Sequence, residues 1–564
     1  MPLFTISGLD SSASAELAVT SHALATYSQT DRALGLPLGQ MLVTLDNIAG
    51  PGTFSANQVT SGLPGGWREV SASELGLPSS LVDVDGYITL QSPLLGNVSR
   101  GPQLKVLAEQ DALGNISRVS VSYAGTNAPV DIVDYSFLNS GKEIAKTMAP
   151  VLSGVASFMD QHGLEGDDAI ITGYSLGGAL ANIQARFSDQ LAGGFFADSH
   201  YLGHASPLIF EADNVLNIGF ENDVIHRFVG DHEDLKSALE GFDGFLENSD
   251  ENYSSSVDNL VLFDAVYSKS PWLLASDSGL NPFAWGAHLG GITSDAVARI
   301  VSSSFYELMS QDSVVVVSSL GAGGRAIHWV GDIDSPTSNH AGEPAFIVGS
   351  VFDDLLRDGA SDDYIEGFAG DDQIRVSTGT NQVEGGQGTD TLLFEGEADD
   401  YEIYRLDDGR IGVSGHDSLT LAGGIERIEF EYGGGFRGAG PGLRYVIEDD
   451  RLEDEFRFDW FDRDIAFVDA PQDGQGGEWS REEVALADAG DSVSSAGARD
   501  DALHLGDLFD DEASFSAESS RASGEGIFGW HGGAMALAGL EAAASFVGSA
   551  LSGHVELPEA WQAI

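Results

Sequence analysis

The segment Ile170-Ile171-Thr172-Gly173-Tyr174-Ser175-Leu176-Gly177-Gly178-Ala179-Leu180 decides the fold of this chain. Residues 168–172 form an apolar run typical of a buried strand, and residues 176–191 follow as a helix. Between them, Gly173-Tyr174-Ser175-Leu176-Gly177 matches the nucleophile elbow, a sharp strand-to-helix turn that exposes a serine hydroxyl. Glycines two residues to either side avoid collisions in that turn, and the helix N-terminus offers free N–H groups to an oxyanion. Ser175 is therefore a candidate nucleophile, with an ordinary Gly-Ser turn as the alternative.

The composition describes a large, strongly acidic globular protein. The 564 residues leave room for two to four domains, and 26 basic against 88 acidic residues give a formal charge of −62. Nucleic acid is a poor partner for such a surface, whereas Ca²⁺ is a plausible one. Two explanations of the acidity stay open together: calcium-binding repeats and adaptation to a salty, halophilic environment.

Targeting signals of the common kinds are missing from the sequence. Residues 1–8 lack the basic and apolar regions of a cleavable signal peptide, and no apolar run is long enough for a transmembrane segment. The chain has no cysteine, so metal ions would have to supply any cross-links outside the cell. The protein is expected either in the cytoplasm or exported by a route that does not read the N-terminus.

Candidates for the other catalytic groups lie further along the chain. Residues 215–220 predict a strand, and Asp223 directly after it stands where an α/β hydrolase keeps its orienting carboxylate. His288, ahead of a helix expected over 294–310, follows both in the required chain order Ser, Asp, His. Many other acids compete with Asp223, and three histidines compete with His288: His200, His204 and His226.

A second oxyanion donor is expected opposite the elbow. Strands predicted over 103–109 and 118–123 are joined by a Gly-Asn turn, and the second leads into Ala124-Gly125-Thr126-Asn127. The backbone N–H groups of Leu176 and Thr126 are therefore the predicted oxyanion hole, although an ordinary turn would explain the second segment equally well.

Five consecutive nine-residue units occupy residues 349–393 and follow the calcium-binding pattern Gly-Gly-x-Gly-x-Asp-x-apolar-x. Glycines let the turn backbone approach the ion, aspartates of stacked turns share Ca²⁺, and the apolar residues stack inside a parallel β-roll. Position six carries Asp354, Asp363, Asp372, Asn381 and Asp390. Position eight carries Leu356, Ile365, Ile374, Val383 and Leu392. Several glycines are missing, so some turns are expected to bind Ca²⁺ poorly or not at all.

Taken together, these motifs resemble the secreted RTX-type lipases of Gram-negative bacteria (family I.3) and their polyurethane-degrading esterase relatives. The likeness covers residues 100–395 and extends to 219–223, 258–263, 285–289 and 305–313. It implies that Ser175 is the nucleophile, His288 the general base and Asp223 its orienting carboxylate. It also implies a Ca²⁺ ion near the active site, held by Glu221, Asp250, Asp258 and Asn259, and export through a type I secretion exporter.

Three features depart from the resemblance. Tyr174 stands where the family usually has histidine before the nucleophile, which should have a modest effect because an aromatic ring can pack there. The segment between Thr126 and the elbow, where the family's first lid lies, is short, which favours shorter or more soluble esters. The acidic ending after residue 470 is also unusual.

The sequence thus predicts an α/β hydrolase-type catalytic domain (1–345), an all-β parallel RTX β-roll (346–400), a β cap (401–470) and an acidic, disordered tail with a possible export signal (471–564). The expected protein is a monomeric, secreted, calcium-dependent serine lipase or esterase that acts on ester or lipid substrates. Two alternatives stay open: a phospholipase or polyester or polyurethane esterase with the same triad, and a non-enzymatic RTX surface protein.

Overall fold

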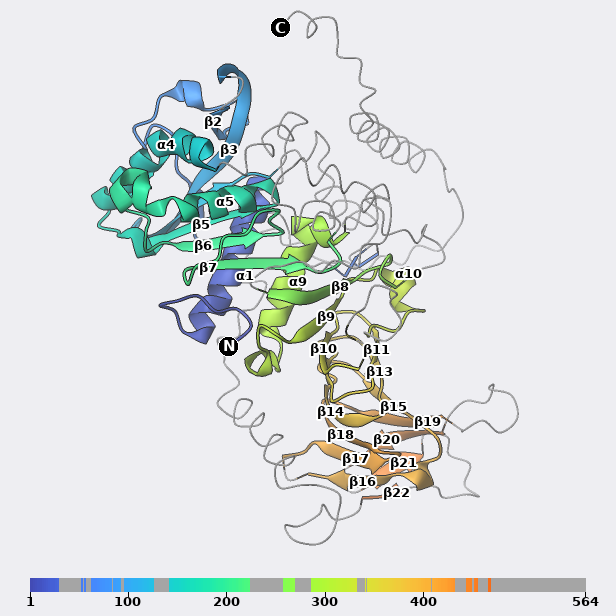
Figure 1. Ribbon diagram of the computed structural model, residues 1–564. Coiled ribbons are helices and arrows are strands. Elements are labelled where there is room, and N and C mark those ends of the chain that lie inside the picture. The colour runs from blue at the N-terminus through green and yellow to red at the C-terminus, as the bar shows by residue number, and fades with distance from the viewer. Residues whose placement is uncertain are drawn as a thin grey trace, which may run out of the picture.

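The computed structural model describes a hydrolase-type sheet domain joined to a β-roll (Figure 1). The described residues are 1–29, 52–53, 55–56, 62–83, 85–92, 96–125, 141–223, 257–268, 286–331, 340, 342–406, 408–431, 443–448, 451–454 and 465–467. The predicted tail, residues 471–564, lies outside them. No helix in these ranges is both long and apolar enough to cross a membrane.

The N-terminal half is built on a sheet whose strands β4 to β10 are all parallel and follow one another in chain order. The antiparallel strands β1 to β3 extend one edge. The bounds are β1 Trp67–Glu69, β2 Ile88–Ser92, β3 Gly96–Gln110, β4 Ile116–Tyr123, β5 Ala169–Tyr174, β6 His200–His204, β7 Val215–Phe220, β8 Val257–Phe263, β9 Val314–Ser318 and β10 Ala345–Val348.

Helices cover both faces of this sheet, as the buried apolar runs of its strands require. Ile171 of β5 packs in the core that contains α4 and α5, while its neighbour Ile170 packs in the core that contains α1 and α9. The helices are α1 Ser11–Gln29, α4 Lys142–Gln161, α5 Leu176–Arg186, α9 Gly290–Ser302 and α10 Ala322–Arg325. Short 3₁₀ turns are η2 Ser79–Leu81, η3 Gly166–Asp168, η4 Ser188–Gly194, η6 Tyr306–Leu308 and η7 Ala398–Asp400.

The helix predicted over 294–310 is present, but both of its predicted ends are wrong. It begins at Gly290, two residues after His288, and ends at Ser302, where Ser303 is extended (φ −61°, ψ 138°). Its end is capped from another part of the chain: the Glu366 carboxylate accepts hydrogen bonds from the Ser303 hydroxyl and the Ser304 N–H. Such a distant cap leaves no local signal in the sequence.

The nonapeptides form the predicted parallel β-roll. The strands are β11 Leu355–Arg357, β12 Tyr364–Glu366, β13 Gln373–Arg375, β14 Gly379–Glu384 and β15 Thr391–Glu395. Strands that are two nonapeptides, or eighteen residues, apart pair in parallel. Strands β10, β12 and β14 therefore make one wall of the roll, and β11, β13 and β15 make the other. The five position-eight side chains are at most 3% exposed, which confirms that they stack inside.

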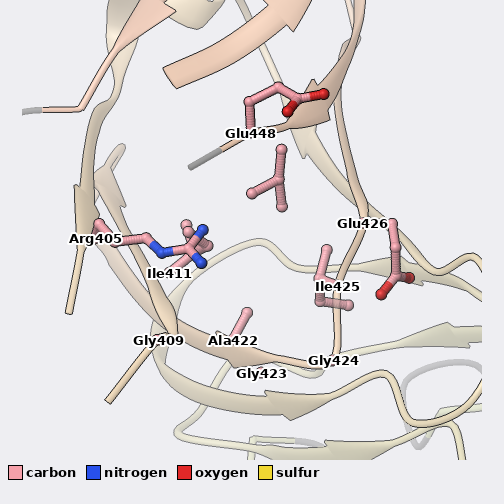
Figure 2. A pocket seen from close by; sticks show the side chains of 10 residues that line it. Arg405, Gly409, Ile411, Ala422, Gly423, Gly424, Ile425, Glu426 and Glu448 are labelled. Carbon is pink, nitrogen blue, oxygen red and sulfur yellow. The ribbon is translucent and has the colours of Figure 1, made fainter. Parts of the chain in front are cut away.

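Seven more strands cap the roll, as the alternation after Tyr401 predicts. β18 pairs with β14 and β19 with β15, each in parallel, and the remaining pairs are antiparallel. The bounds are β16 Glu402–Arg405, β17 Ile411–Gly415, β18 Ser418–Gly423, β19 Arg427–Glu431, β20 Leu443–Ile447, β21 Arg451–Asp454 and β22 Ile465–Ala466. The cap contains a hollow of about 240 Å³. Its lining includes Arg405, Ile425, Glu426 and Glu448 (Figure 2).

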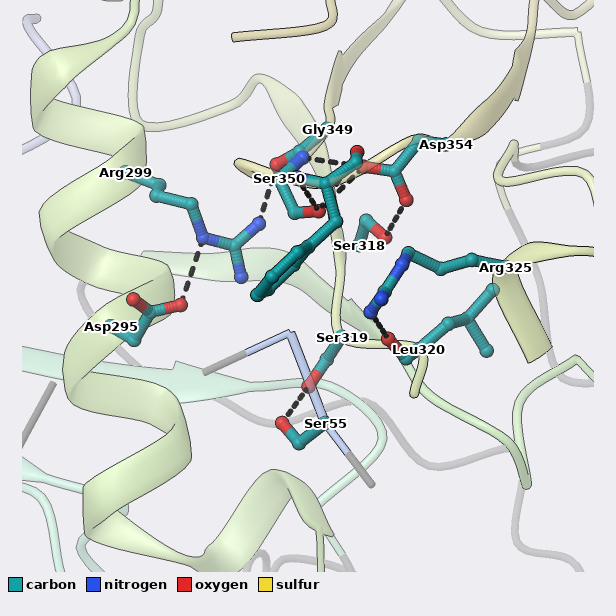
Figure 3. A network of polar contacts seen from close by, with 11 residues as sticks. Ser55, Asp295, Arg299, Ser318, Ser319, Leu320, Arg325, Gly349, Ser350 and Asp354 are labelled. Atoms are coloured by element: carbon teal, nitrogen blue, oxygen red, sulfur yellow. Dashed lines mark hydrogen bonds and ion pairs between the residues drawn. The ribbon is translucent and has the colours of Figure 1, made fainter. Parts of the chain in front are cut away.

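The roll is joined to the N-terminal half by a continuous sheet and by buried polar contacts. β10 pairs with β9 on one side and with β12 on the other, so one sheet runs through both parts. Figure 3 shows the buried Arg299 of α9 bonded to Asp295 (2.9 Å) and donating to the Gly349 carbonyl of the first repeat. The Asp354 carboxylate accepts from Ser318 of β9 (2.9 Å). Helix α9, which begins two residues after His288, is therefore hydrogen-bonded to the first repeat of the roll.

Candidate active site

Ser175 lies at the turn between β5 and α5, in a strained backbone conformation. Its φ of 56° and ψ of −123° are rare for a residue with a side chain. A Cβ added to Gly173 would lie 2.3 Å from the Gly177 backbone, and one added to Gly177 would lie 2.2 Å from the Tyr123 carbonyl oxygen. Both glycines are thus required for the turn, which supports the elbow over an ordinary Gly-Ser turn.

Three side chains from distant parts of the sequence meet here. His288 Nε2 lies 2.9 Å from Ser175 Oγ, and His288 Nδ1 lies 2.7 Å from Asp223 Oδ2. Ser175 follows β5, Asp223 follows β7, and His288 stands just before α9. Asp223 is fully buried and His288 is 7% exposed, so bulk water screens their interaction little. This arrangement can deprotonate a serine hydroxyl and stabilise the resulting imidazolium.

The expected oxyanion donors lie on the same turn and next to it. Leu176 is the first residue of α5, so its N–H has no acceptor within the helix. Thr126 lies outside the described residues, but Gly125 before it packs on the elbow: an added Cβ would lie 2.8 Å from the Tyr174 carbonyl oxygen. The end of β4 therefore runs alongside the nucleophile.

The rival histidines are placed differently. His204 is fully buried and its Nε2 lies 3.0 Å from Ser21 Oγ, while its carbonyl accepts the Ser175 N–H (2.9 Å). His200 begins β6 and is partly exposed, and His226 lies outside the described residues. Burial lowers the pKa of both His200 and His204.

A layer of buried polar side chains next to the elbow, contributed partly by α1, was not predicted from the sequence. Ser21 and His22 of this helix are buried, and His22 Nε2 lies 3.0 Å from Thr293 Oγ1 of α9. The sequence signal is the serine, threonine and histidine content of α1. The structure shows that most residues of this helix, including polar ones, are buried. Buried polar side chains in a helix require partners, and these partners lie 183 and 271 residues away.

The Ca²⁺ site that the resemblance implies near the triad stays a prediction, because the side chains of only two of its four residues are described. Glu221 Oε2 lies 2.7 Å from His340 Nε2, and both side chains are 6% exposed, so a histidine partners this carboxylate. Asn259 Nδ2 donates to the Asp312 carbonyl (3.2 Å). Asp250 lies outside the described residues, as does the side chain of Asp258. We therefore derive no step through a metal ion at this place.

The roll, by contrast, carries carboxylates suited to Ca²⁺ on one of its two sides. Asp372 Oδ2 and Asp390 Oδ2 are buried and have no hydrogen-bond partner in the described part of the chain. They face the glycine turns: a Cβ on Gly367 would lie 2.2 Å from the first, and one on Gly385 would lie 2.8 Å from the second. Two unpartnered carboxylate oxygens beside accessible carbonyls are the donors that Ca²⁺ prefers.

The other position-six side chains are already hydrogen-bonded by the protein. Asp363 accepts from the N–H groups of Ala345 (2.8 Å) and Gly359 (2.6 Å). Both Asp354 oxygens accept from serines, Ser318 and Ser350. Asn381 has no carboxylate. Within the described residues, no three His, Asp or Glu side chains gather as a metal site, so backbone carbonyls would complete the coordination.

The burial of these acids makes the stability of the calcium-free roll depend on pH. Burial, with Asp354 and Asp390 nearby, raises the pKa of Asp372 from 3.8 to about 9, and burial with Glu426 nearby raises that of Asp390 to about 6. The folded state therefore prefers the protonated acids, and this stabilisation is lost as pH rises through those values.

We expect that, in a Ca²⁺ chelator, the free energy of unfolding of the roll falls as pH increases from 5 to 9. Added Ca²⁺ should oppose this fall, because the ion binds the deprotonated carboxylates. Denaturation followed by far-UV circular dichroism at several pH values, with and without Ca²⁺, measures both trends. A calcium-free roll that becomes more stable toward pH 9 would contradict this assignment.

Comparisons with known proteins agree with this geometry. The RTX calcium-binding nonapeptide repeat family model matches residues 348–383 and 366–400. A lipase of Pseudomonas fluorescens is 32% identical over 303 residues, which are 50% of this chain and 60% of the relative. A second P. fluorescens lipase is 32% identical over 301 residues, 50% of this chain and 64% of the relative. The chain thus spans less than two thirds of either curated relative.

A solved structure extends the likeness further. The extracellular lipase LipA of Serratia marcescens superposes with a TM-score of 0.67 at 28% identity, and the match covers 81% of this chain and 78% of that one. The α/β hydrolase-type domain followed by a β-roll is thereby confirmed, and the nonapeptides are of the calcium-binding type. The chain is therefore homologous to the Pseudomonas and Serratia lipases and carries RTX calcium-binding repeats.

Proposed function

We propose that this protein is a secreted, calcium-dependent carboxylic-ester hydrolase, a lipase or esterase that works through an acyl-enzyme on Ser175. The observation that carries the proposal is the continuous contact from Ser175 Oγ through His288 to Asp223, at 2.9 and 2.7 Å. These distances lie within the hydrogen-bond range that a nucleophile, its base and the orienting carboxylate require. Homology to lipases over half of the chain supports it.

In the first half-reaction, Ser175 Oγ attacks the ester carbonyl as its proton passes to His288 Nε2. Asp223 accepts the Nδ1–H hydrogen bond, which holds the imidazole tautomer and stabilises the imidazolium. The N–H of Leu176 at the start of α5, and that of Thr126 as the sequence predicts, stabilise the oxyanion. His288 then donates its proton to the leaving alcohol, and the acyl group stays on Ser175.

In the second half-reaction, a water molecule takes the place of the alcohol. His288 Nε2 accepts a proton from this water as its oxygen attacks the acyl carbonyl. Collapse of the second tetrahedral intermediate breaks the bond to Ser175 Oγ, which recovers its proton from His288. The products are a carboxylic acid and the free enzyme.

Replacing Asp223 with asparagine should lower kcat by about 10⁴-fold, because an amide favours the wrong imidazole tautomer. KM should change much less, since Asp223 is buried behind the histidine. Steady-state kinetics on a p-nitrophenyl ester measure the split. A fall of less than about tenfold would show that Asp223 does not orient the base.

The ester class is a proposal that a substrate panel tests. Triacylglycerols, phospholipids and polyesters all present the carbonyl that this triad attacks. We propose simple esters and acylglycerols as substrates; a clear preference for phospholipid or for a polyester or polyurethane film would identify the alternative hydrolase. Labelling with an active-site-directed phosphonate tests the non-enzymatic alternative, because only a working nucleophile reacts.

We propose that Asp372 and Asp390, with carbonyls of the glycine turns, hold Ca²⁺ in the roll. The bound ion would neutralise their buried carboxylates and cross-link successive turns. Asp354 continues this row of stacked turns as a hydrogen-bond acceptor, and Asp363 does the same on the other side of the roll, where its N–H donates to Asn381 Oδ1 (3.0 Å). Glu426 ends the first row by accepting the Asp390 N–H (2.8 Å), as Asp390 does for Asp372.

We further propose that the protein leaves the cell through a type I exporter, folds its roll in external Ca²⁺, and works as a monomer. The RTX repeats support export, and the net charge of −62 suits a salty medium, where repulsion between acidic groups is screened. Secretion from a host with and without a type I exporter tests the route. Light scattering tests the oligomeric state.

A further inference from the structure

Five polar side chains form a closed layer directly beneath the elbow. We call Ser21, His22, Tyr174, His204 and Thr293 the sub-elbow cluster; each is at most 2% exposed. Burying polar groups costs free energy unless they are hydrogen-bonded, so a cluster of this kind requires a well-defined set of partners. None of these residues is assigned a step in the reaction above.

The contacts of Thr293 indicate which of the hydroxyl and imidazole groups in the cluster donate hydrogen bonds. Its Oγ1 is 3.1 Å from Tyr174 Oη, 3.0 Å from His22 Nε2 and 3.3 Å from the carbonyl oxygen of Leu289. A carbonyl can only accept, and we assign the threonine hydroxyl as donor to Leu289 and as acceptor from Tyr174 and His22, which corresponds to the His22 tautomer protonated on Nε2. His22 Nδ1 then carries no proton, which agrees with the lack of a partner for this atom among the described residues.

The second histidine follows the same rule. Ser21 Oγ donates to the Ala18 carbonyl (3.1 Å) and accepts from His204 Nε2 (3.0 Å), and His204 Nδ1 has no partner in the described ranges. The His22 and His204 rings lie 4.1 Å apart. Burial lowers the pKa of His22 to about 3 and that of His204 well below its usual value, so the cluster stays neutral while the protein works.

The cluster contacts the segment that carries the general base. The Tyr174 ring centre lies 5.6 Å from that of His288, at an interplanar angle of 59°. A Cβ added to Gly290 would lie 3.4 Å from the Tyr174 ring, so this ring also packs against Gly290. Thr293 also donates to the Leu289 carbonyl. The cluster therefore contacts each of the three successive residues 288–290.

We propose that Tyr174, Thr293 and His22 are positioning residues that hold the His288 imidazole in the orientation from which it bonds both Ser175 and Asp223. The inference rests on the proposed function, and it extends the site beyond the triad. Small displacements of a general base are costly: about 1 Å can reduce turnover about 100-fold. A merely structural cluster would affect stability without affecting the base.

Matched threonine substitutions separate these two roles. Thr293→Val keeps the side-chain shape but removes the acceptor of Tyr174 and His22, while Thr293→Ser keeps the hydroxyl. Thr172→Val is the control: Thr172 is fully buried in β5, and its hydroxyl donates to the Ser21 carbonyl (3.2 Å), away from residues 288–290. All three are compared with the wild type by thermal unfolding and by ester hydrolysis over a range of pH.

We expect Thr293→Val to lower kcat about 10- to 100-fold with little change in KM. The acid limb of its pH profile should also change, because moving the imidazole relative to Asp223 alters the surroundings of the general base. The neutral cluster cannot itself cause this change. Thr293→Ser should restore most of kcat, and Thr172→Val should keep the wild-type kcat and profile.

The inference is overturned if Thr293→Val loses stability as Thr172→Val does but keeps the wild-type kcat and pH profile. A wild type that hydrolyses no ester and takes no phosphonate would instead refute the proposed function. In that event, NMR spectra of the His288 ring still decide: ring resonances displaced in Thr293→Val but not in Thr172→Val support positioning, and unchanged resonances in all variants exclude it.

Discussion

Ser175→Ala should reduce hydrolysis of p-nitrophenyl butyrate by about 10⁴-fold or more while the protein stays folded. The hydroxyl is the attacking group in the proposed reaction, and it lies 2.9 Å from His288 Nε2. The backbone strain at φ 56° is present with either residue, so stability should change little. Residual activity should come from the oxyanion donors and substrate binding.

A matched serine controls for burial. Ser122 of β4 is fully buried and its hydroxyl donates to the Leu24 carbonyl (3.0 Å), so Ser122→Ala removes a similar group from the same sheet. We expect this variant to keep wild-type turnover. Ser175→Ala with turnover near that of the wild type would contradict the assignment of the nucleophile.

Removing Ca²⁺ should have the second large effect, on the roll first and on catalysis through it. At 100 times its dissociation constant, one bound ion stabilises the folded state by about 2.7 kcal/mol. For a unit the size of the roll this corresponds to about 10 °C or more in the unfolding midpoint. Chelation should lower that midpoint, remove β signal in the far-UV spectrum, and abolish most of the activity.

The loss of activity follows from how α9 is held. Arg299 binds the carbonyl of Gly349 in the first repeat, and Glu366 of the second repeat caps the end of the helix. His288 stands just before the start of the same helix. If the roll unfolds, α9 loses both attachments, and the base loses its fixed position relative to Ser175.

Point variants locate the effect. Asp372→Asn and Asp390→Asn should reduce the calcium-dependent gain in stability, because each removes an unpartnered oxygen from the proposed site. Asp363→Asn should lower stability equally with and without Ca²⁺, since protein N–H groups already use both of its oxygens. Asp399→Asn, at an exposed position, controls for the change in charge. Equal calcium dependence in all four would contradict the assignment to one side of the roll.

The parts that sequence reasoning predicted well are those whose signal is local. The elbow can be read from five residues because Gly173 and Gly177 must leave space for the backbone of the turn. The roll can be read from its period, since a residue at position eight of each unit falls inside at every turn. The hairpin of β3 and β4 and the strand β7 follow from apolar runs and turn residues in the same way.

What sequence reasoning missed depends on contacts between distant residues. Nothing near Ser302 indicates that Glu366 ends α9, and nothing near His22 indicates Thr293 as its partner. The contact of Glu221 with His340, 119 residues away, likewise has no local signal in the sequence. The choice of His288 among thirteen histidines also needed the resemblance, because chain order leaves several candidates.

The central claim is that Ser175 is a nucleophile activated by His288 and Asp223. Labelling the calcium-loaded protein with a fluorophosphonate, followed by peptide mass mapping, tests it most directly. We expect one adduct, on the peptide that carries Ser175, and a much slower reaction in Asp223→Asn. No adduct, or an adduct on a different serine in protein that hydrolyses esters, would contradict it.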